Sequence, residues 1–145
     1  MRNYPPSTRR SLLVEWGDAG GSFVDLILVM LGGALGSLAR YGVGLGAAQL
    51  FGSTFPLGTM LINISGSFLL GLLVSLSGPM AISSGTRLFL ATGFCGGYTT
   101  FSTFSVETLN LMEKGSYGLA LVYLLGNLVG GLMAAWTGFV LARAL

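Results

Sequence analysis

Charged residues are scarce in this sequence: only 8% of the 145 residues are Asp, Glu, Lys or Arg. An ordinary soluble domain carries roughly 25%. Histidine is absent and Cys95 is the single cysteine, which excludes disulfide frameworks, zinc sites and Ser-His or Cys-His catalysis. A thiol in an apolar helix with no nearby base also stays protonated. The composition therefore argues against a soluble domain and against an enzyme.

Long uncharged runs replace the missing charge. No charged residue occurs from Tyr41 to Thr86 or from Gly115 to Ala142. Turn signals divide these runs, and a bilayer core about 30 Å thick needs about 20 helical residues. No alternating strand pattern suggests a barrel. The sequence thus predicts an all-α membrane protein with four transmembrane helices, at 25–49, 57–76, 87–111 and 118–143.

The N-terminal residues differ from the rest of the chain. They are rich in charge, contain Pro5-Pro6, and lack an apolar core long enough for a secretory signal peptide. We therefore expect a flexible N-terminal extension over residues 1–24, followed by a single transmembrane domain over residues 25–145.

The basic residues near the predicted helix ends are almost evenly divided between the two sides of the membrane. Four helices place Arg87 and Arg143 on the side of the termini, against Lys114 and Arg40 on the other. Lys and Arg in short loops normally set membrane orientation. The near balance makes insertion in both orientations an open alternative.

The first predicted helix carries small residues at four-residue intervals, which favours close helix packing; they are Gly32, Gly36, Gly44 and Ala48. Arg40 interrupts this series. An arginine near the bilayer centre costs at least a few kcal/mol, so we expect a structural or electrostatic role, with snorkelling to the interface as the alternative. Four helices enclose a pathway poorly, which favours an oligomer.

Two predicted helices place polar side chains on stripes of small residues. Thr59, Asn63 and Ser67 share one face of the second helix, and Tyr123 and Asn127 share one face of the fourth. An asparagine amide has four hydrogen-bonding sites and no easy intrahelical partner. The pattern indicates either pairing between helices or a polar pathway.

The third predicted helix contains a poor helical stretch, Gly96-Gly97 followed by Tyr98-Thr99-Thr100. We expect a break here that frees backbone carbonyls, the arrangement with which discontinuous transporter helices hold cations. After it, Phe101, Phe104, Ser105 and Thr108 share one face. Aromatic ring edges carry partial positive charge, so these rings and the nearby hydroxyl and amide donors suit a small anion.

Three stretches match a known family in order and spacing: "GGALGSLARY" (32–41), "GTMLINISGSFLLG" (58–71) and "TGFCGGYTTFSTFSVET" (92–108). From about Leu26 to Leu145 the chain resembles the Fluc (CrcB-type) fluoride channels. The resemblance implies a fluoride-selective passive channel of the cytoplasmic (inner) membrane that exports fluoride and lowers its toxicity inside the cell. Its partners would be fluoride, the lipid bilayer and a second copy of the chain, with no nucleic acid.

The resemblance also implies an architecture and a set of site residues. Two four-helix subunits would pack antiparallel as a dual-topology homodimer, with the third helix broken at the membrane midplane. A structural Na⁺ on the dyad would be held by the backbone carbonyls of Gly96 and Thr99. Two fluoride pathways would be lined by Asn63, Phe101 and Phe104, with a polar track at Tyr123. Further residues expected along the pathway are Thr59, Ser105 and Asn127.

Other functions compete with this interpretation. A small dual-topology multidrug transporter shares the architecture but depends on a membrane-embedded glutamate, whereas Asp25 and Glu107 lie near predicted helix ends. A purely structural membrane protein leaves the face of phenylalanine and hydroxyl residues without a purpose. The sequence therefore favours a channel.

Overall fold

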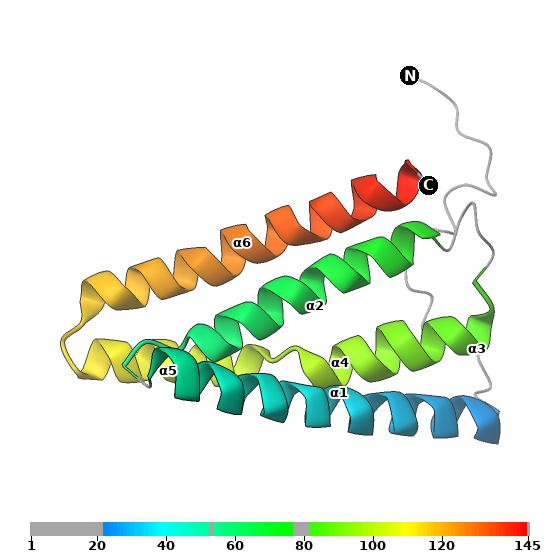
Figure 1. Ribbon diagram of the computed structural model, residues 1–145, viewed down its shortest axis with the longest axis horizontal. Helices are drawn as coiled ribbons and strands as arrows, with labels where there is room; N and C mark the ends of the chain where they lie inside the picture. Colours follow the sequence, from blue (N-terminus) through cyan, green and yellow to red (C-terminus); the bar gives the residue numbers. More distant parts are fainter. Residues whose placement is uncertain (1–21, 53, 77–81, 145) are drawn as a thin grey trace.

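The computed structural model describes residues 22–52, 54–76 and 82–144, which form helices and turns with no strand among them. The expected extension, residues 1–24, lies almost entirely outside these ranges. The elements are α1 (Phe23–Phe51), α2 (Leu57–Leu76), α3 (Ser84–Arg87), the π-helix η2 (Leu88–Cys95), α4 (Gly96–Tyr98), α5 (Phe101–Glu113) and α6 (Tyr117–Arg143). Figure 1 shows that α1, α2, the segment from α3 to α5, and α6 run in alternating directions along the molecule.

Three of the helices, α1, α2 and α6, are long and apolar enough to cross a membrane. Ser22 starts α1 with a capping box, in which its Oγ accepts from Asp25 N and Asp25 Oδ2 accepts from Ser22 N. The helix ends before Gly52, whose φ of +76° suits glycine. The sequence predicted α2 with the observed bounds, while the third predicted helix consists of shorter pieces.

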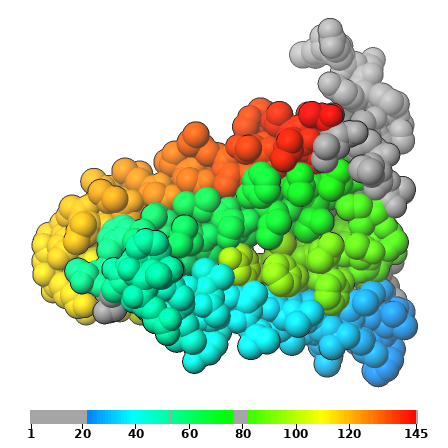
Figure 2. Space-filling model, viewed as in Figure 1, coloured from blue at the N-terminus to red at the C-terminus, as the bar shows by residue number. Residues whose placement is uncertain are grey.

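Many large apolar side chains are exposed on the outside of the molecule, whose helices Figure 2 shows as space-filling atoms. On α6, for example, Leu132, Met133 and Trp136 are all more than half exposed. Soluble proteins rarely expose apolar surface so extensively, whereas lipid tails accept it without cost. The all-helical chain with several membrane-capable helices therefore forms a multi-pass membrane protein, as predicted.

Glycines bring α1 against the segment that contains η2 and α4. A Cβ on Gly32 would collide with the carbonyl oxygen of Phe89, and one on Gly36 with that of Phe94. A Cβ on Gly97 would likewise collide with the Gly33 carbonyl. The predicted close packing is thus confirmed for the first half of α1. It does not extend to Gly44, where a Cβ would meet nothing within 4 Å.

A second tight pair, α2 and α6, is built in the same way. A Cβ on Gly71 would collide with the carbonyl oxygen of Ala135, and one on Gly138 with that of Phe68. The two halves of the broken segment pack against different helices, η2 and α4 against α1 and α5 against α6, while α2 contacts both halves. The break is therefore surrounded by helices on several sides.

Gly36→Ala tests the close approach of α1. In an exposed helix, replacing glycine with alanine stabilises the helix by up to about 1 kcal/mol. Here the added methyl group must displace the Phe94 backbone, and such overpacking typically costs about 1–3 kcal/mol. We expect a lower thermal unfolding midpoint in detergent. Gly118→Ala is the control, because a Cβ there meets nothing within 4 Å. Equal midpoints for the two variants would contradict the packing described.

Candidate functional site

The third membrane segment is broken at Thr99 and Thr100. Both residues are extended, with φ, ψ of −78°, 159° and −151°, 119°, and α5 begins directly after them. The predicted break in the stretch from Gly96 to Thr100 is confirmed, and it falls at the two threonines and not at the glycines. Gly96 is helical, with φ −63° and ψ −39°, and Gly97 serves the contact with Gly33. Gly97 therefore allows close packing, and the break follows it in the chain.

The threonines themselves stabilise the two new helix ends. Thr99 Oγ1 donates to the Cys95 carbonyl oxygen at 3.0 Å. Thr100 caps α5, because its Oγ1 accepts from Thr103 N at 3.2 Å. An N-cap of this kind is worth typically about 1 kcal/mol, and extended backbone suits β-branched residues. Local chemistry therefore ends one helix and starts the next within two residues.

Asn63 on α2 takes over both backbone hydrogen bonds of Thr100. Thr100 N donates to Asn63 Oδ1 at 2.9 Å, and Asn63 Nδ2 donates to the Thr100 carbonyl oxygen at 3.1 Å. Thr100 is buried, and a buried backbone group without a partner costs about 1–3 kcal/mol. The asparagine amide thus replaces the helical bonds that the break removes.

Further hydrogen bonds connect this amide to α6 and α5. Asn63 Nδ2 also donates to Asn127 Oδ1 at 3.0 Å, and Asn127 Nδ2 donates to the Tyr123 carbonyl oxygen at 3.0 Å. The hydroxyl of Tyr123, which is fully buried, donates to Glu107 Oε2 at 2.6 Å. The predicted asparagines of two helices are therefore paired with one another.

Aromatic rings pack beside this network. Phe104 is buried, and its ring centroid lies 5.5 Å from that of Tyr123 and 5.7 Å from that of Phe101. Phe101 is 77% exposed. Both phenylalanines face a groove of about 250 Å³ whose lining contains no charged side chain. Its polar lining comes from Asn63, Ser67, Thr99, Thr100 and Asn127.

Three expected pathway residues do not line this groove: Ser105, Thr59 and Tyr123. Ser105 donates to the Phe101 carbonyl oxygen at 2.9 Å within its own helix. Thr59 is buried and lines a second cavity of about 430 Å³, between α1, α2 and α5. The structure therefore gathers Asn63, Phe101, Phe104 and Asn127 around one groove, with Tyr123 packed against Phe104.

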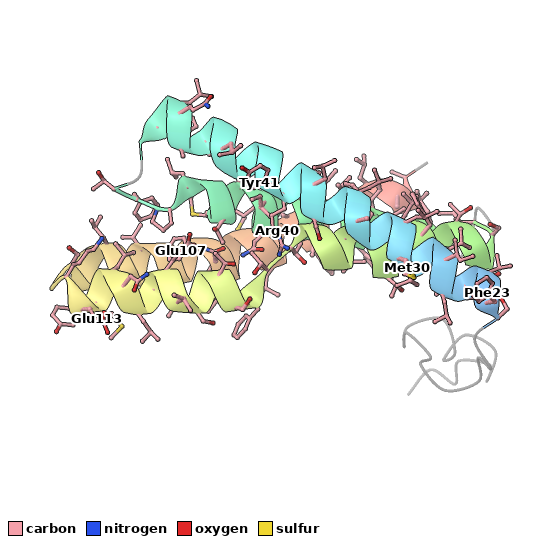
Figure 3. All side chains as sticks on the ribbon, turned by 90° about the horizontal axis from the view of Figure 1, so that it is seen from below. Phe23, Met30, Arg40, Tyr41, Glu107 and Glu113 are labelled. Carbon is pink, nitrogen blue, oxygen red and sulfur yellow. The ribbon has the colours of Figure 1, made fainter. Side chains whose placement is uncertain are left out.

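Arg40 lines the second cavity together with Thr59 and Thr103. Its Nη1 donates to the Thr99 carbonyl oxygen at 3.5 Å, a long hydrogen bond. Figure 3 shows Arg40 on α1 beside the gap between α4 and α5. The guanidinium thus brings positive charge to the break.

Two residues of the site are missing from the sequence-based set. Glu107 accepts a hydrogen bond from the Tyr123 hydroxyl. The sequence indicated this residue by placing a carboxylate inside an apolar segment, which normally marks a functional position. Thr100 supplies the peptide that Asn63 holds. Its role depends on a contact between two helices, which cannot be predicted from the local sequence pattern.

Among the described residues, no three His, Cys, Asp or Glu side chains form a group that could hold a metal ion. Backbone oxygens are the other ligand type for a hard cation. In a continuous helix Thr100 N–H would bond to the Gly96 carbonyl oxygen, but it bonds to Asn63 instead. The Gly96 carbonyl therefore loses its helical donor, and this fits the oxygen ligand that a small cation requires.

Comparison with known proteins gives consistent results. A family model described as CrcB-like protein, Camphor Resistance (CrcB), matches residues 27–139. A Gloeobacter violaceus protein is 54% identical over 122 residues, covering 83% of this chain and 98% of the relative. Proteins of Thermus thermophilus and Agrobacterium fabrum are 50% and 46% identical, covering 82% and 84% of this chain and 94% and 98% of their own lengths. All three are named "Fluoride-specific ion channel FluC". The chain belongs to the CrcB-like family.

Proposed function

We propose that this protein is a passive, fluoride-selective channel that lets fluoride leave the cell across the cytoplasmic membrane. The observation that carries the proposal is the groove at the break, where the Asn63 amide and the rings of Phe101 and Phe104 meet. The three similar proteins that are named fluoride-specific ion channels support it.

The chemistry of the groove suits a small anion that has lost water. Ring edges and N–H groups offer partial positive charge, and fluoride is small enough to contact several of them together. No lysine or arginine lines the groove, so nothing would trap the ion. Conduction requires binding that is favourable but easily reversed, and neutral donors meet that requirement.

A multidrug transporter is the less favoured function. It would need a membrane carboxylate that is free to exchange protons and bind cations. Glu107 instead accepts a 2.6 Å hydrogen bond from a fully buried tyrosine. The relatives' names also describe a channel and not a transporter or an enzyme.

The proposed assembly is an antiparallel, dual-topology homodimer in which the segment from α3 to α5 forms a fourth, broken membrane span. Two observations support it. Phe101 is 77% exposed beside an open groove, and a second subunit would cover it. The near balance of basic residues between the two ends removes the usual bias toward one orientation. Two grooves per dimer would then give two pathways.

We also propose a structural sodium ion on the dimer axis at the membrane midplane. The carbonyls of Gly96 and Thr99 from both subunits would hold it, since a site on a two-fold axis receives each ligand twice. A bound cation would satisfy the Gly96 carbonyl, which has lost its helical donor and would be costly to leave bare, and it would add positive potential for a passing anion.

Exchange of sodium for N-methylglucamine tests this site. We expect a shorter dimer lifetime and lower fluoride flux, because the organic cation is too large for a carbonyl cage. Gly96→Val should weaken both properties, while Gly118→Val, at an exposed helix start, is the control. Unchanged dimer lifetime after sodium is demonstrably removed would contradict a structural role for the ion.

Fluoride efflux from liposomes tests the proposed function itself. Liposomes containing the purified protein and loaded with potassium fluoride should release fluoride when a potassium ionophore balances charge. The same liposomes loaded with potassium chloride should retain chloride. Fluoride retention, or equal release of the two anions, would refute a fluoride-selective channel.

A further inference from the structure

The Asn63 amide has no hydrogen-bond donor left for an ion. One Nδ2 hydrogen goes to the Thr100 carbonyl oxygen at 3.1 Å and the other to Asn127 Oδ1 at 3.0 Å. Asn63 Oδ1 accepts from Thr100 N, so the amide cannot be turned to free a donor without breaking this bond. An anion that uses Asn63 must therefore displace an existing acceptor.

Asn127 is the acceptor that can be displaced without disturbing the backbone of the break. The Thr100 carbonyl belongs to the buried break, where a lost partner destabilises the backbone. Asn127 lines the groove together with Phe101 and Phe104, the same space that the ion would enter. Releasing Asn127 opens the Asn63 donor to the groove and leaves the broken backbone intact.

We propose that Asn127 is an internal competitor for the anion, which occupies the Asn63 donor between ions and thereby sets the affinity of the site. This inference rests on the proposed function and adds an affinity-determining role for Asn127. Asn127 is itself buried and held in orientation, since its Nδ2 donates to the Tyr123 carbonyl oxygen. Its oxygen is therefore positioned to return when the ion leaves.

The competition has a specific energetic signature. Exchanging an N–H···O bond for a charge-assisted N–H···anion bond is favourable, because the latter is roughly twice as strong. Breaking the Asn63–Asn127 bond costs the same for every anion, so it lowers all anion affinities by one common factor. Asn127 should consequently affect the fluoride concentration needed for half-maximal flux and the release rate, but not the ratio of fluoride to chloride.

Asn127→Leu removes the competing oxygen at similar volume. We expect its half-saturating fluoride concentration to fall by about three- to tenfold, the range that one net hydrogen bond allows. Maximal flux should also fall, because the ion leaves a tighter site more slowly, and chloride should stay excluded. Asn127→Ala should shift the half-saturating concentration in the same direction, which separates loss of the acceptor from a change of volume.

Thr137→Val is the matched control. Thr137 Oγ1 donates to the Met133 carbonyl oxygen at 2.7 Å on the same helix, so the variant also loses a bond from a side chain to its own helix. It lies outside the groove and should keep the wild-type half-saturating concentration. General damage to α6 would weaken binding in every variant and cannot produce the expected gain.

Fluoride titration of the wild-type protein gives a second measurement that needs no variant. The side-chain amide resonance of Asn63 in ¹⁵N-labelled protein should shift with fluoride and not with chloride. An unchanged or raised half-saturating concentration in Asn127→Leu and Asn127→Ala, or an Asn63 amide insensitive to fluoride, overturns the role of Asn127. Absence of fluoride flux in wild-type liposomes refutes the proposed function instead, so the two failures are distinguishable.

Discussion

Replacing Asn63 with leucine is expected to reduce fluoride flux at least about 100-fold. The change removes the donor that faces the groove and leaves the N–H and carbonyl of buried Thr100 without their partners. A hydrogen bond to a charged group is worth about 1.5–3 kcal/mol, and about 2.7 kcal/mol corresponds to a 100-fold change in rate. Fluoride efflux from liposomes measures the loss, and the thermal unfolding midpoint should fall as well.

Two further variants separate conduction from folding in this experiment. Asn63→Asp keeps an acceptor for Thr100 N–H, but its carboxylate has no donor and places negative charge against the anion, so flux should remain low with better folding. Asn110→Leu changes the same residue type at an exposed position of α5 and should conduct normally. Near wild-type flux through Asn63→Leu would contradict the role given to this amide.

Replacing Phe101 with isoleucine is expected to lower fluoride flux at least about tenfold while the subunit stays folded. Isoleucine keeps the apolar bulk and removes the ring edge. The interaction energy between a ring edge and a fully charged ion should exceed the ~0.5–1.5 kcal/mol that a pair of neutral aromatic rings contributes. Since Phe101 is 77% exposed in the subunit, little packing within the subunit is lost.

Phe23→Ile is the control for Phe101→Ile, because Phe23 is also 77% exposed but does not line the groove. Figure 3 shows it at the end of α1, away from Arg40. Phe104→Ile should lose flux too, with some loss of stability, since Phe104 packs against Tyr123. Wild-type flux in both Phe101→Ile and Phe104→Ile would remove the rings from the mechanism.

The helices could be predicted from the sequence because lipid imposes a simple rule on a spanning segment. Uncharged runs of sufficient length must form helices, and the bounds of α2 matched the prediction. The start of α1 was shifted by two residues, to Phe23, through the capping box of Ser22 and Asp25. A cap depends on two local hydrogen bonds, which hydropathy does not detect.

The break was predicted in the right segment but for a partly wrong reason. Low helix propensity correctly marked the stretch from Gly96 to Thr100 as weak. Propensity alone could not show that Gly97 would be held in helix by contact with α1. The break occurs where Asn63 offers the backbone alternative partners, and that contact joins residues far apart in the sequence.

The polar stripes pointed to the right residues but did not reveal all the hydrogen bonds between them. Asn63 and Asn127 were expected either to pair or to line a pathway, and they pair while lining the groove. The hydrogen bond between Tyr123 and Glu107 was not foreseen. Glu107 lies near a predicted helix end, and this position hid the significance of a carboxylate in an apolar segment. Ser105 bonds within its own helix, so its place in the pathway stays a prediction.

The most direct measurement of the central claim is the reversal potential of a planar bilayer containing the purified protein, with fluoride at different concentrations on the two sides and an opposite chloride gradient. A passive fluoride channel predicts a current that reverses at the fluoride equilibrium potential, about 59 mV per tenfold gradient for a single charge. Reversal at the chloride potential would contradict fluoride selectivity. Fluoride movement without current would contradict a channel.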